Sequence, residues 1–403
     1  MLCSGLSPTG RALFDIDRTR PLSLYLHIPF CTRKCSYCGF FSKAGCSEAA
    51  IDAFASKLVS EIDFISQSLG KPFCTVFIGG GNPGILGEKR LLAIAKACCR
   101  WGKPSEFTVE MNPENAGSWL EGPLEYITRL SIGVQSLDQK VLDILGRNSS
   151  ALDTLRGIEE SQRLKQLCGF SLNYDFICCV PGCRESSVQD LKKIRELARF
   201  EHLSLYSLMV EPKTVMGIRA EKGEFSPVGD DDQADELEML WDLLESSGME
   251  HYEVSNFAAG PDHECLHNKV YWNMGQYLGL GPGAASTLYS PYTRVECLSN
   301  VDQYINSPLF SGYRTEALGR IQQMEEWAIM GCRTRYGLGS DDCLARFGVR
   351  LPSFLEYPGF TYDGSFFRPG RKGFLLADGA ASYVLDALAS SDADGEESGI
   401  GQN

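Results

Sequence analysis

Three cysteines close together in the sequence offer the clearest chemistry in this chain. They are spaced Cys31-Thr-Arg-Lys-Cys35-Ser-Tyr-Cys38, and the loop between them also carries arginine, lysine and serine. Three thiolates from one loop can hold three irons of a [4Fe–4S] cluster and leave the fourth iron open to another ligand. A structural zinc site would need a fourth Cys or His of comparable placement, and the next thiol, Cys46, lies beyond the loop. The spacing therefore predicts an iron–sulfur cluster, with zinc or three free thiols as the alternatives.

The elements that would position this loop follow from alternating extended and helical patterns. Apolar and β-branched runs bounded by Gly, Pro or polar residues predict six strands, at residues 22–28, 74–79, 107–112, 129–136, 171–178 and 202–208. Apolar residues at three- and four-residue spacing predict helices at residues 48–69, 89–101, 152–167, 188–200 and 231–246. Strand-then-helix units imply a parallel sheet with right-handed crossovers. We therefore expect an α/β fold, a partial (β/α)6 TIM-like barrel at residues 21–257, with its site at the C-terminal ends of the strands.

The pattern changes after residue 257. Glycines and prolines crowd residues 258–300, which we interpret as a connecting segment of turns. Short helical patterns, an expected hairpin and a closing helix predict a small, mainly helical, winged-helix-like C-terminal domain at residues 301–389. The hairpin is expected at residues 366–371 and 373–377, and the closing helix at 379–389. Residues 1–20 form an N-terminal extension, and the acidic segment 390–403 lacks apolar periodicity, which predicts a disordered tail.

Composition excludes several classes of protein. The 38 Lys and Arg stand against 52 Asp and Glu, a net charge of −14, so we expect no nucleic-acid partner. The sequence contains neither a run of 18 apolar residues nor a signal-peptide pattern, which predicts a cytoplasmic protein. Thiols stay reduced there, and 16 cysteines in 403 residues are too sparse for a disulfide scaffold. The thirteen cysteines outside the loop are therefore interpreted as packing residues.

The cysteine loop belongs to a longer string, Leu24-Tyr-Leu-His-Ile-Pro-Phe-Cys31, and further motifs follow it in order. They are Gly79-Gly-Gly-Asn-Pro83, Glu110-Met-Asn-Pro113, Ser131-Ile-Gly-Val-Gln-Ser136 with Leu145-Gly-Arg147, Asn173-Tyr-Asp-Phe-Ile177, Tyr252-Glu-Val-Ser-Asn-Phe257 and His267-Asn-Lys-Val-Tyr-Trp272. Together they resemble radical S-adenosylmethionine (SAM) proteins, specifically the oxygen-independent coproporphyrinogen III oxidase group and its HemW-type haem-chaperone branch. The resemblance runs from about residue 21 to residue 385.

The resemblance implies that SAM chelates the open iron and is cleaved to a 5′-deoxyadenosyl radical by an electron from the reduced cluster. The implied contacts to SAM are Tyr25, Tyr37, Gly80, Gly81, Asn82, Glu110, Gln135, Arg147 and Asp175. Among them, Glu110 matches a position that binds the ribose hydroxyls, and Arg147 suits the SAM carboxylate because a guanidinium binds carboxylates through two hydrogen bonds. From the residues alone, a tight turn at the glycines, a helix-terminal cation at Arg147 and plain packing of the tyrosines stay open.

Two functions compete within the resemblance. A HemW-type protein binds the cluster, SAM and haem and transfers haem to acceptor proteins, whereas the oxidases decarboxylate the propionates of coproporphyrinogen III. The oxidases carry a further Cys where this chain has Phe40, which favours the chaperone branch. The family often has His where this chain has Ser149 and Ala285, so His267 or a cysteine is the expected haem ligand. For His267, a histidine hydrogen-bonded within a turn-rich interface is the alternative.

A radical enzyme acting on another tetrapyrrole is a third possibility. The implied partners are haem or another tetrapyrrole, haem-accepting proteins and a reducing electron donor. Weak association with a membrane is left open by the composition.

Overall fold

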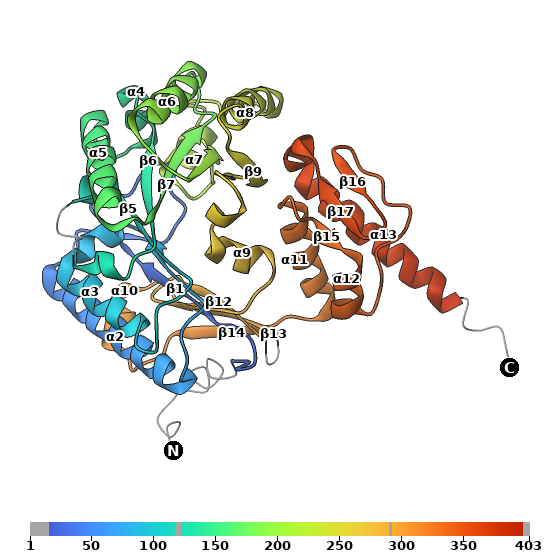
Figure 1. Cartoon of the computed structure of the whole chain (residues 1–403), viewed down its shortest axis with the longest axis horizontal. Coiled ribbons are helices and arrows are strands. Elements are labelled where there is room, and N and C mark those ends of the chain that lie inside the picture. The colour runs from blue at the N-terminus through green and yellow to red at the C-terminus, as the bar shows by residue number, and fades with distance from the viewer. Residues whose placement is uncertain (1–15, 118–121, 290–291, 398–403) are drawn as a thin grey trace.

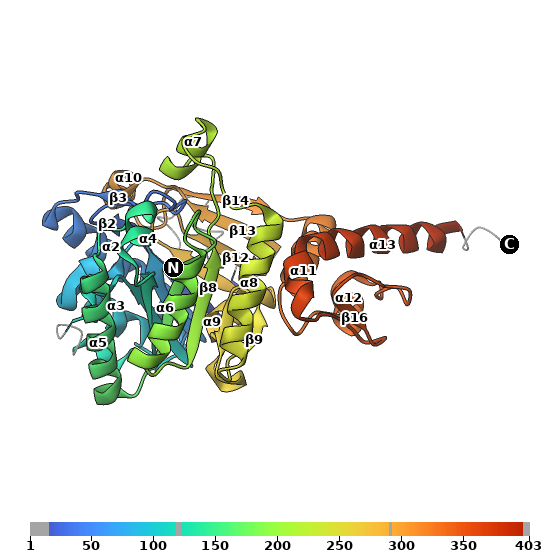
Figure 2. The same cartoon turned by 90° about the horizontal axis from the view of Figure 1, so that it is seen from above.

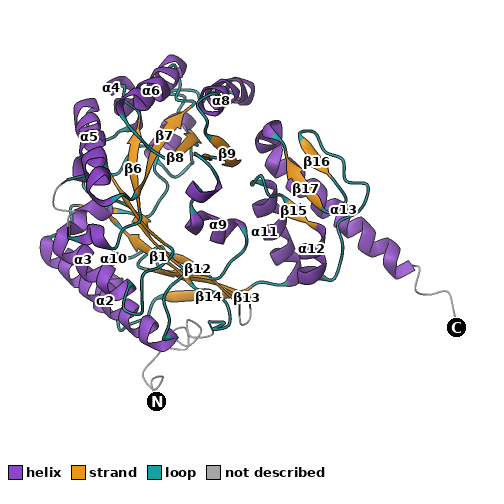
Figure 3. Cartoon of the chain, viewed as in Figure 1, coloured by secondary structure: helices purple, strands orange, loops and turns teal. Residues whose placement is uncertain are grey.

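The computed structural model of the chain describes residues 16–117, 122–289 and 292–397. Figure 1 shows a curved sheet with helices around its outside and a smaller C-terminal body beside it. Colouring by secondary structure separates the layers, with strands inside and helices outside in the larger body (Figure 3). This arrangement is the α/β barrel that the alternating pattern predicts.

The six predicted strands are present and form the centre of the sheet. Neighbours along the sheet run parallel and in chain order: β1 (Ser23–Ile28), β4 (Thr75–Gly80), β5 (Glu106–Met111), β6 (Arg129–Gln135), β7 (Ser171–Cys178) and β8 (His202–Ser207). The outer helices are α2 (Glu48–Leu69), α3 (Gly87–Cys98), α4 (Gln139–Leu145), α5 (Ala151–Cys168), α6 (Arg184–Leu197) and α8 (Asp230–Glu245), with the short α7 (Val215–Glu221) before α8. The C-terminal ends of the parallel strands therefore meet at one rim.

Helix α2 illustrates how the sequence specifies these elements. The Ser47 hydroxyl accepts a hydrogen bond from the Ala50 N–H at the start of the helix, and Gly70 ends it with a left-handed φ of 66°. Between these ends, a stripe of apolar side chains at helical spacing packs against the sheet: Ile51, Phe54, Leu58, Ile62 and Ile65. The main core lies between such helical stripes and the outward-facing residues of the strands.

The segment 258–300 differs from the expected series of turns, because it extends the sheet. Strand β11 (Tyr277–Leu280) pairs parallel with β1, and β12 (Ala285–Tyr289), β13 (Tyr292–Cys297) and β14 (Tyr313–Ala317) continue the sheet antiparallel. Glycine allows β11 and β12 to approach each other closely, because a Cβ on Gly279 would collide with the carbonyl oxygen of Ala285. At the opposite edge, β10 (Asn256–Ala258) and β9 (Glu250–Glu253) also pair antiparallel.

The C-terminal body has its own small core. It comprises α11 (Arg320–Cys332), α12 (Ser340–Phe347), α13 (Ala377–Glu397) and a sheet ordered β15 (Leu338–Gly339), β17 (Phe366–Pro369), β16 (Phe360–Tyr362). Seen from above in Figure 2, this body stands to one side of the barrel and α13 extends away from it. Its helices and short hairpin agree with the predicted helical, winged type.

Two local predictions in this body are wrong. The hairpin is formed by β16 and β17, and residues expected as its second strand form the 3-10 helix η6 (Arg371–Leu376). The turn is made by Asp363, whose carboxylate accepts the N–H groups of Ser365 and Phe366, and by Gly364 at a φ of 86°. The expected tail, residues 390–403, is helical as far as Glu397, since α13 continues through an alanine-rich stretch. Residues 398–403, and residues 1–15 of the N-terminal extension, lie outside the described residues.

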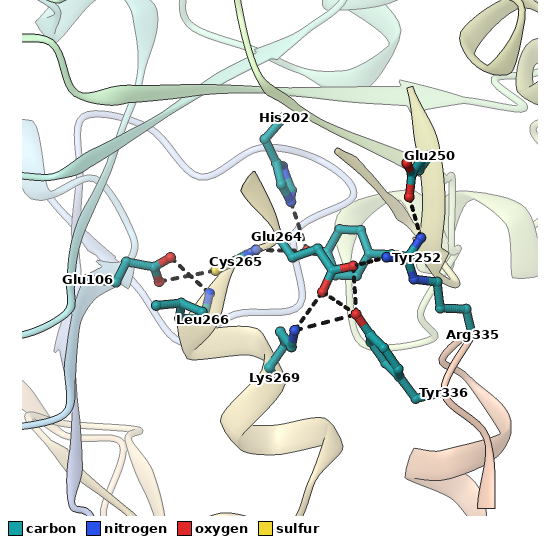
Figure 4. Close-up of polar contacts among 10 residues, drawn as sticks. All are labelled: Glu106, His202, Glu250, Tyr252, Glu264, Cys265, Leu266, Lys269, Arg335 and Tyr336. Atoms are coloured by element: carbon teal, nitrogen blue, oxygen red, sulfur yellow. Dashed lines mark hydrogen bonds and ion pairs between the residues drawn. The ribbon is translucent and has the colours of Figure 1, made fainter. Parts of the chain in front are cut away.

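An ion-pair network joins the two bodies (Figure 4). The Glu264 side chain, 1% exposed, accepts from Lys269 Nζ at 2.6 Å and Arg335 Nη2 at 2.7 Å, and from the Tyr336 hydroxyl. On the barrel side, the Glu106 carboxylate accepts the first N–H groups of α9 (Leu266–Trp272), at the positive end of its dipole. These contacts fix α9 between the sheet and the C-terminal body. No helix among the described residues is both long and apolar enough to cross a membrane.

Candidate functional site

The cysteine loop follows β1 and is tied to the rim by backbone hydrogen bonds. Cys31 ends the short β2 (Phe30–Cys31), which pairs with β3 (Lys43–Ala44). The Ser36 N–H donates to Leu145 O at 3.0 Å, its hydroxyl donates to Ile144 O at 3.1 Å, and its carbonyl accepts the Met216 N–H. The loop is therefore held by α4 and α7 rather than by its own turns alone.

The pKa values of two of the three thiols, Cys31 and Cys38, are raised by their surroundings. Burial raises the pKa of Cys31, and the neighbouring Cys38 and Cys35 raise it further. Burial also raises the pKa of Cys38, while the Phe40 N–H lowers it. Arg147 is the nearby cation, with Nη1 3.7 Å from Cys35 Sγ. Three thiols beside a cation form a ligand set suited to a metal cluster. The irons of such a cluster would bind the cysteines as thiolates.

A run of three glycines lies against this loop. A Cβ on Gly81 would lie 2.5 Å from Phe30 O and 3.0 Å from Cys31 Sγ. A Cβ on Gly79 would lie 2.5 Å from Glu110 Oε2, and Gly80 has a φ of 108°, which glycine adopts most readily. The strand end therefore forms a cradle beside the thiols that side chains would fill.

Half-buried residues of neighbouring strands line the inside of the barrel. They include one from each of β1, β4, β5, β6 and β7: Tyr25, Phe77, Glu110, Gly133 and Asp175. Burial raises the pKa of Glu110 to about 7, the charge of Asp175 adds to the shift, and the Gly80 N–H, 3.2 Å away, opposes it. Two carboxyl groups thus face the interior, where they can accept hydrogen bonds from a ligand.

Asp175 is oriented by its neighbours. It accepts from the Ser131 hydroxyl at 3.0 Å and from the Asn173 amide at 2.8 Å, and burial raises its pKa. This support from adjacent strands fixes the carboxyl direction relative to the barrel interior.

Arg147 bridges the cysteine loop and β6. Its Nη2 donates to Gly133 O at 2.9 Å and to Asn112 Oδ1 at 3.1 Å, while its buried Nε has no partner among the described residues. Burial raises the pKa of the adjacent Tyr37 phenol, and the Arg147 charge opposes that shift. An unmatched guanidinium N–H beside the thiols fits a ligand carboxylate at this place.

Gln135 ends β6 in an unusual conformation. Its φ is 64°, in the left-handed region, and the pairing of β6 with β7 shifts register just before it. Such strain in a residue other than glycine is common where a side chain is held for function. The structure therefore brings Gln135 to the same rim as Arg147.

Asn82 is predicted to contact SAM, but its side chain makes its contacts within the protein. Its side chain is fully buried, its Oδ1 accepts the N–H groups of Gly84 and Asn112, and its Nδ2 donates to Asn115 at 2.6 Å. Both ends of the amide are satisfied by the protein, so Asn82 shapes the loop after β4 rather than facing a ligand.

His267 also lies away from open space. It is 0% exposed, its Nδ1 pairs with Thr75 Oγ1 at 2.7 Å, and its Nε2 pairs with the Tyr271 hydroxyl at 2.8 Å. Burial lowers its pKa to about 3. Because both ring nitrogens are hydrogen-bonded, the imidazole holds α9 against β4. This agrees with the alternative prediction for His267, a histidine hydrogen-bonded within an interface. Ser149, at a position where relatives often carry His, donates its hydroxyl to Glu114.

A cavity of about 470 Å³ lies where the barrel meets the C-terminal body. This cavity is not among the predicted features, although two sequence motifs, Tyr252 to Phe257 and His267 to Trp272, supply part of its wall. Its lining includes Tyr206, Glu253, Asn256, Tyr271, Trp272 and Tyr277. Three buried polar atoms of the lining residues have no partner among the described residues: Glu253 Oε1, Asn256 Oδ1 and Trp272 Nε1. Unmatched donors and acceptors beside a cavity are a sign of a ligand site.

A second group of possible metal ligands lies at the end of β7. Donor atoms of Cys178, Cys179 and Glu236 lie within 4.8 Å of one another and are buried. Glu236 Oε1, however, already accepts the Cys179 N–H and the Ser187 hydroxyl, both at 2.9 Å. The buried Glu236 carboxylate therefore supports the backbone of Cys179, which has a left-handed φ of 57°.

Comparison with known proteins matches residues 25–194 to the model of the radical SAM superfamily. The heme chaperone HemW of Lactococcus lactis is 33% identical over 326 residues, which cover 79% of this chain and 83% of that protein. HemW of Escherichia coli is 35% identical over 293 residues, covering 68% and 72%. The mitochondrial radical S-adenosyl methionine domain-containing protein 1 of Danio rerio is 32% identical over 335 residues, covering 78% and 73%.

Among solved structures, coproporphyrinogen III oxidase HemN of Escherichia coli superposes with a TM-score of 0.76 at 21% identity, covering 93% of this chain and 92% of that one. This similarity confirms the predicted fold, including the smaller body beside the barrel.

Proposed function

This chain belongs to the radical SAM superfamily and, within it, to the family of HemW-related proteins, and we propose that it is a haem chaperone. It binds a [4Fe–4S] cluster, SAM and haem, and it passes haem to acceptor proteins. The observation that carries the haem function is the cavity between the barrel and the C-terminal body, with four tyrosines and Trp272 in its lining, in a chain whose relatives are named heme chaperones.

Cys31, Cys35 and Cys38 would hold the cluster, which supplies an open iron for SAM and, when reduced, an electron. The fit rests on the gathered thiols, the cradle at Gly81 and the unpartnered Nε of Arg147. Arg147 binds the SAM carboxylate, because its Nη1 lies 3.7 Å from Cys35 Sγ and its buried Nε has no partner among the described residues. Tyr37 packs beside the apolar cluster of α4 and lies close enough to Arg147 for the Arg147 charge to oppose the rise in its pKa that burial causes, so its ring helps to keep water from that side of the site.

The interior of the barrel holds the rest of SAM. Glu110 and Asp175 accept hydrogen bonds from the ligand's hydroxyl or amino groups, and Gly79 leaves room beside Glu110, whose Oε2 accepts the Gly80 N–H at 3.2 Å. Gln135 contributes its amide from the rim, and Tyr25 forms an aromatic wall on β1. The Tyr25 hydroxyl is tied to His27 Nδ1 at 2.9 Å, which fixes the ring.

The exposed Phe40 separates this chain from the oxidases. Its side chain is 68% exposed and its carbonyl accepts Lys34 Nζ at 3.0 Å. A phenyl ring offers no metal ligand at the position where the oxidases carry a thiol. Oxidation of coproporphyrinogen III is therefore the less favoured function.

An anaerobic reconstitution tests these assignments together. The full chain is incubated with iron and sulfide, and its iron–sulfur absorption, SAM binding, haem binding and loss of coproporphyrinogen III are measured side by side. We expect cluster, SAM and haem to bind and coproporphyrinogen III to persist. Formation of protoporphyrinogen would overturn the chaperone proposal. An iron–sulfur spectrum that survives in the Cys31→Ala, Cys35→Ala, Cys38→Ala variant would overturn the cluster assignment.

A further inference from the structure

The cavity between the barrel and the C-terminal body has a largely apolar and aromatic wall with a small number of charged groups. Met274, Met330 and Trp272 belong to the apolar part of the lining. In a wall of this kind the few charged groups decide how a ligand is oriented and which ligand charge is accepted. Those of the described lining are Glu253, Arg294, Glu326 and Arg333.

Two of these groups, Arg294 and Glu326, neutralise each other. The Arg294 guanidinium forms an ion pair with the Glu326 carboxylate, and its Nη1 donates to the Tyr277 hydroxyl at 2.9 Å and to Thr287 Oγ1 at 2.7 Å. The other oxygen of Glu326 accepts the Tyr292 hydroxyl at 2.7 Å. The protein already uses both ends of this pair, so it adds no net charge to the cavity.

Glu253 adds no full negative charge at neutral pH. Its side chain is 1% exposed, its Oε1 has no partner among the described residues, and its Oε2 accepts the Ser255 N–H at 3.4 Å. An ionised carboxylate is costly in such surroundings, and burial raises the pKa of Glu253 to about 8. At pH 7 most of this carboxyl group therefore carries its proton.

Arg333 remains as the net cation of the described lining. Its Nε and Nη2 donate to Asp378 Oδ1 at 3.2 and 2.7 Å, whereas its Nη1 donates to none of the described residues. Asp378 is outside the lining and its side chain is 80% exposed. Water screens an ion pair of this kind, which contributes little to stability. A ligand carboxylate can therefore bind Arg333 at Nη1, or replace Asp378, at little cost.

The position of Arg333 is fixed by backbone hydrogen bonds between the two bodies. Arg333 directly follows α11, and its carbonyl accepts the Val254 N–H at 3.0 Å. Two residues further on, the Arg335 N–H donates to Tyr252 O at 3.0 Å. The C-terminal body thus presents this guanidinium to the barrel side of the cavity from a backbone that is held in place, which favours binding of a ligand that spans both bodies.

Haem has the matching chemistry, since its ring is flat and apolar and its propionate carboxylates lie together at one edge. We propose that Arg333 is a specificity-determining residue of this cavity that binds a propionate carboxylate, so that the cavity selects tetrapyrroles with free propionates. This inference rests on the proposed haem function. The contact is a charge-assisted hydrogen bond, and no covalent bond changes when it forms.

The test compares two ligands that differ only at the propionates. The full chain, anaerobically reconstituted with its cluster, is titrated with ferric haem and with ferric haem dimethyl ester, and binding is followed by absorption. Wild type is expected to bind haem roughly tenfold more tightly than the ester, because a hydrogen bond to a charged group is lost with the ester. Arg333→Gln should weaken haem binding roughly tenfold and leave the affinity for the ester unchanged, and Arg333→Lys should restore part of the loss.

Two control variants separate the cation from its structural contacts. Asp378→Asn removes the same ion pair but keeps the Arg333 charge, and it should bind haem at least as tightly as wild type. Arg350→Gln removes an exposed, paired arginine of the same body that is outside the described lining, and it should change neither affinity. Thermal unfolding of each variant confirms that it is folded.

Several results would overturn the inference. These are equal affinity of wild type for haem and its ester, unchanged haem affinity in Arg333→Gln, and an equal loss of both ligands in that variant, which would indicate a structural role. A loss of haem affinity in Asp378→Asn as large as that in Arg333→Gln would also overturn it, because the ion pair rather than the cation would then be responsible. Failure of wild type to bind either ligand would instead overturn the proposed function.

Discussion

Gly81→Ala probes the contact between the glycine cradle and the cysteine loop with the smallest available change. The added methyl group would lie 2.5 Å from Phe30 O, 2.9 Å from Ile28 O and 3.0 Å from Cys31 Sγ. Two of these atoms are backbone and cannot rotate away. Since ordinary contact begins at 3.4 Å, the segments must separate by 0.9 Å, the difference between 3.4 and 2.5 Å.

That separation acts directly on the first thiol. The two segments are tied by the Gly81 N–H to Ile28 O at 2.8 Å and the Asn82 N–H to Phe30 O at 2.7 Å, and Cys31 follows Phe30 in the chain. Overpacking of this kind costs about 1–3 kcal/mol. If the strain falls on the cluster-bound state, binding of the cluster weakens by roughly 5- to 150-fold.

The assay is iron and sulfide content per chain after anaerobic reconstitution, read with the absorption of the cluster. Gly81→Ala is expected to retain less cluster than wild type after gel filtration while its far-ultraviolet circular dichroism stays unchanged. Gly229→Ala is the matched control, because a Cβ there meets nothing within 4 Å and the backbone is extended. Wild-type cluster content in Gly81→Ala would refute the view that the glycine run is held against the thiols.

Three further predictions concern other parts of the molecule. Glu110 binds its proton near pH 7 when folded but near 4.5 when unfolded, so the free energy of unfolding decreases as the pH rises from about 4.5 to about 7, and Glu110→Gln should flatten that part of the profile. Glu264→Gln leaves the largely buried Lys269 without its counter-charge and removes one of the two carboxylates paired with Arg335, which keeps Glu250, and should lower the free energy of unfolding by about 3 kcal/mol in a urea titration. Arg147→Lys keeps the charge but loses the paired N–H donors of the guanidinium. It should weaken SAM binding about tenfold, measured by calorimetry, at unchanged iron content.

Each of the three has a control on the surface. Glu316→Gln on the exposed face of β14 should leave the pH profile unchanged, and a uniform offset at every pH in Glu110→Gln would contradict the assignment of that proton. Asp341→Asn breaks an exposed ion pair with Arg350 and should lower the free energy of unfolding by less than about 1 kcal/mol. An equally small decrease in Glu264→Gln would contradict the view that the Glu264 network stabilises the contact between the two bodies. Arg219→Lys, paired with Glu224 at the surface, should not change SAM affinity.

The sequence predicted those features that local patterns determine. The six parallel strands followed from apolar, β-branched runs, and α2 followed from its apolar stripe with Ser47 and Gly70 at its ends. The cysteine loop could be identified because the three thiols are local in sequence. A local pattern does not distinguish a glycine that makes a turn from one that allows two strands to approach, which is why β11 to β13 were expected as turns.

Local patterns do not show which way a side chain points, nor which distant segments of the chain pack together. Asn82 and His267 are polar residues in matching motifs, yet their side chains point into the protein and are satisfied there. The cavity is built by segments distant in sequence, from Tyr206 on β8 to Met330 on α11, so no single stretch could show it. Its local signals were two motifs, Tyr252 to Phe257 and His267 to Trp272, and neither by itself indicates a cavity.

Transfer of haem tests the central claim most directly. The reconstituted chain, loaded with one equivalent of ferric haem, is mixed with a haem-free b-type protein, and the absorption of the acceptor is followed beside an equal amount of free haem and beside coproporphyrinogen III. The proposed function predicts that the acceptor gains haem from the chain faster than from free haem, while coproporphyrinogen III is not consumed. Haem that stays on the chain, or conversion of coproporphyrinogen III to protoporphyrinogen, would contradict it.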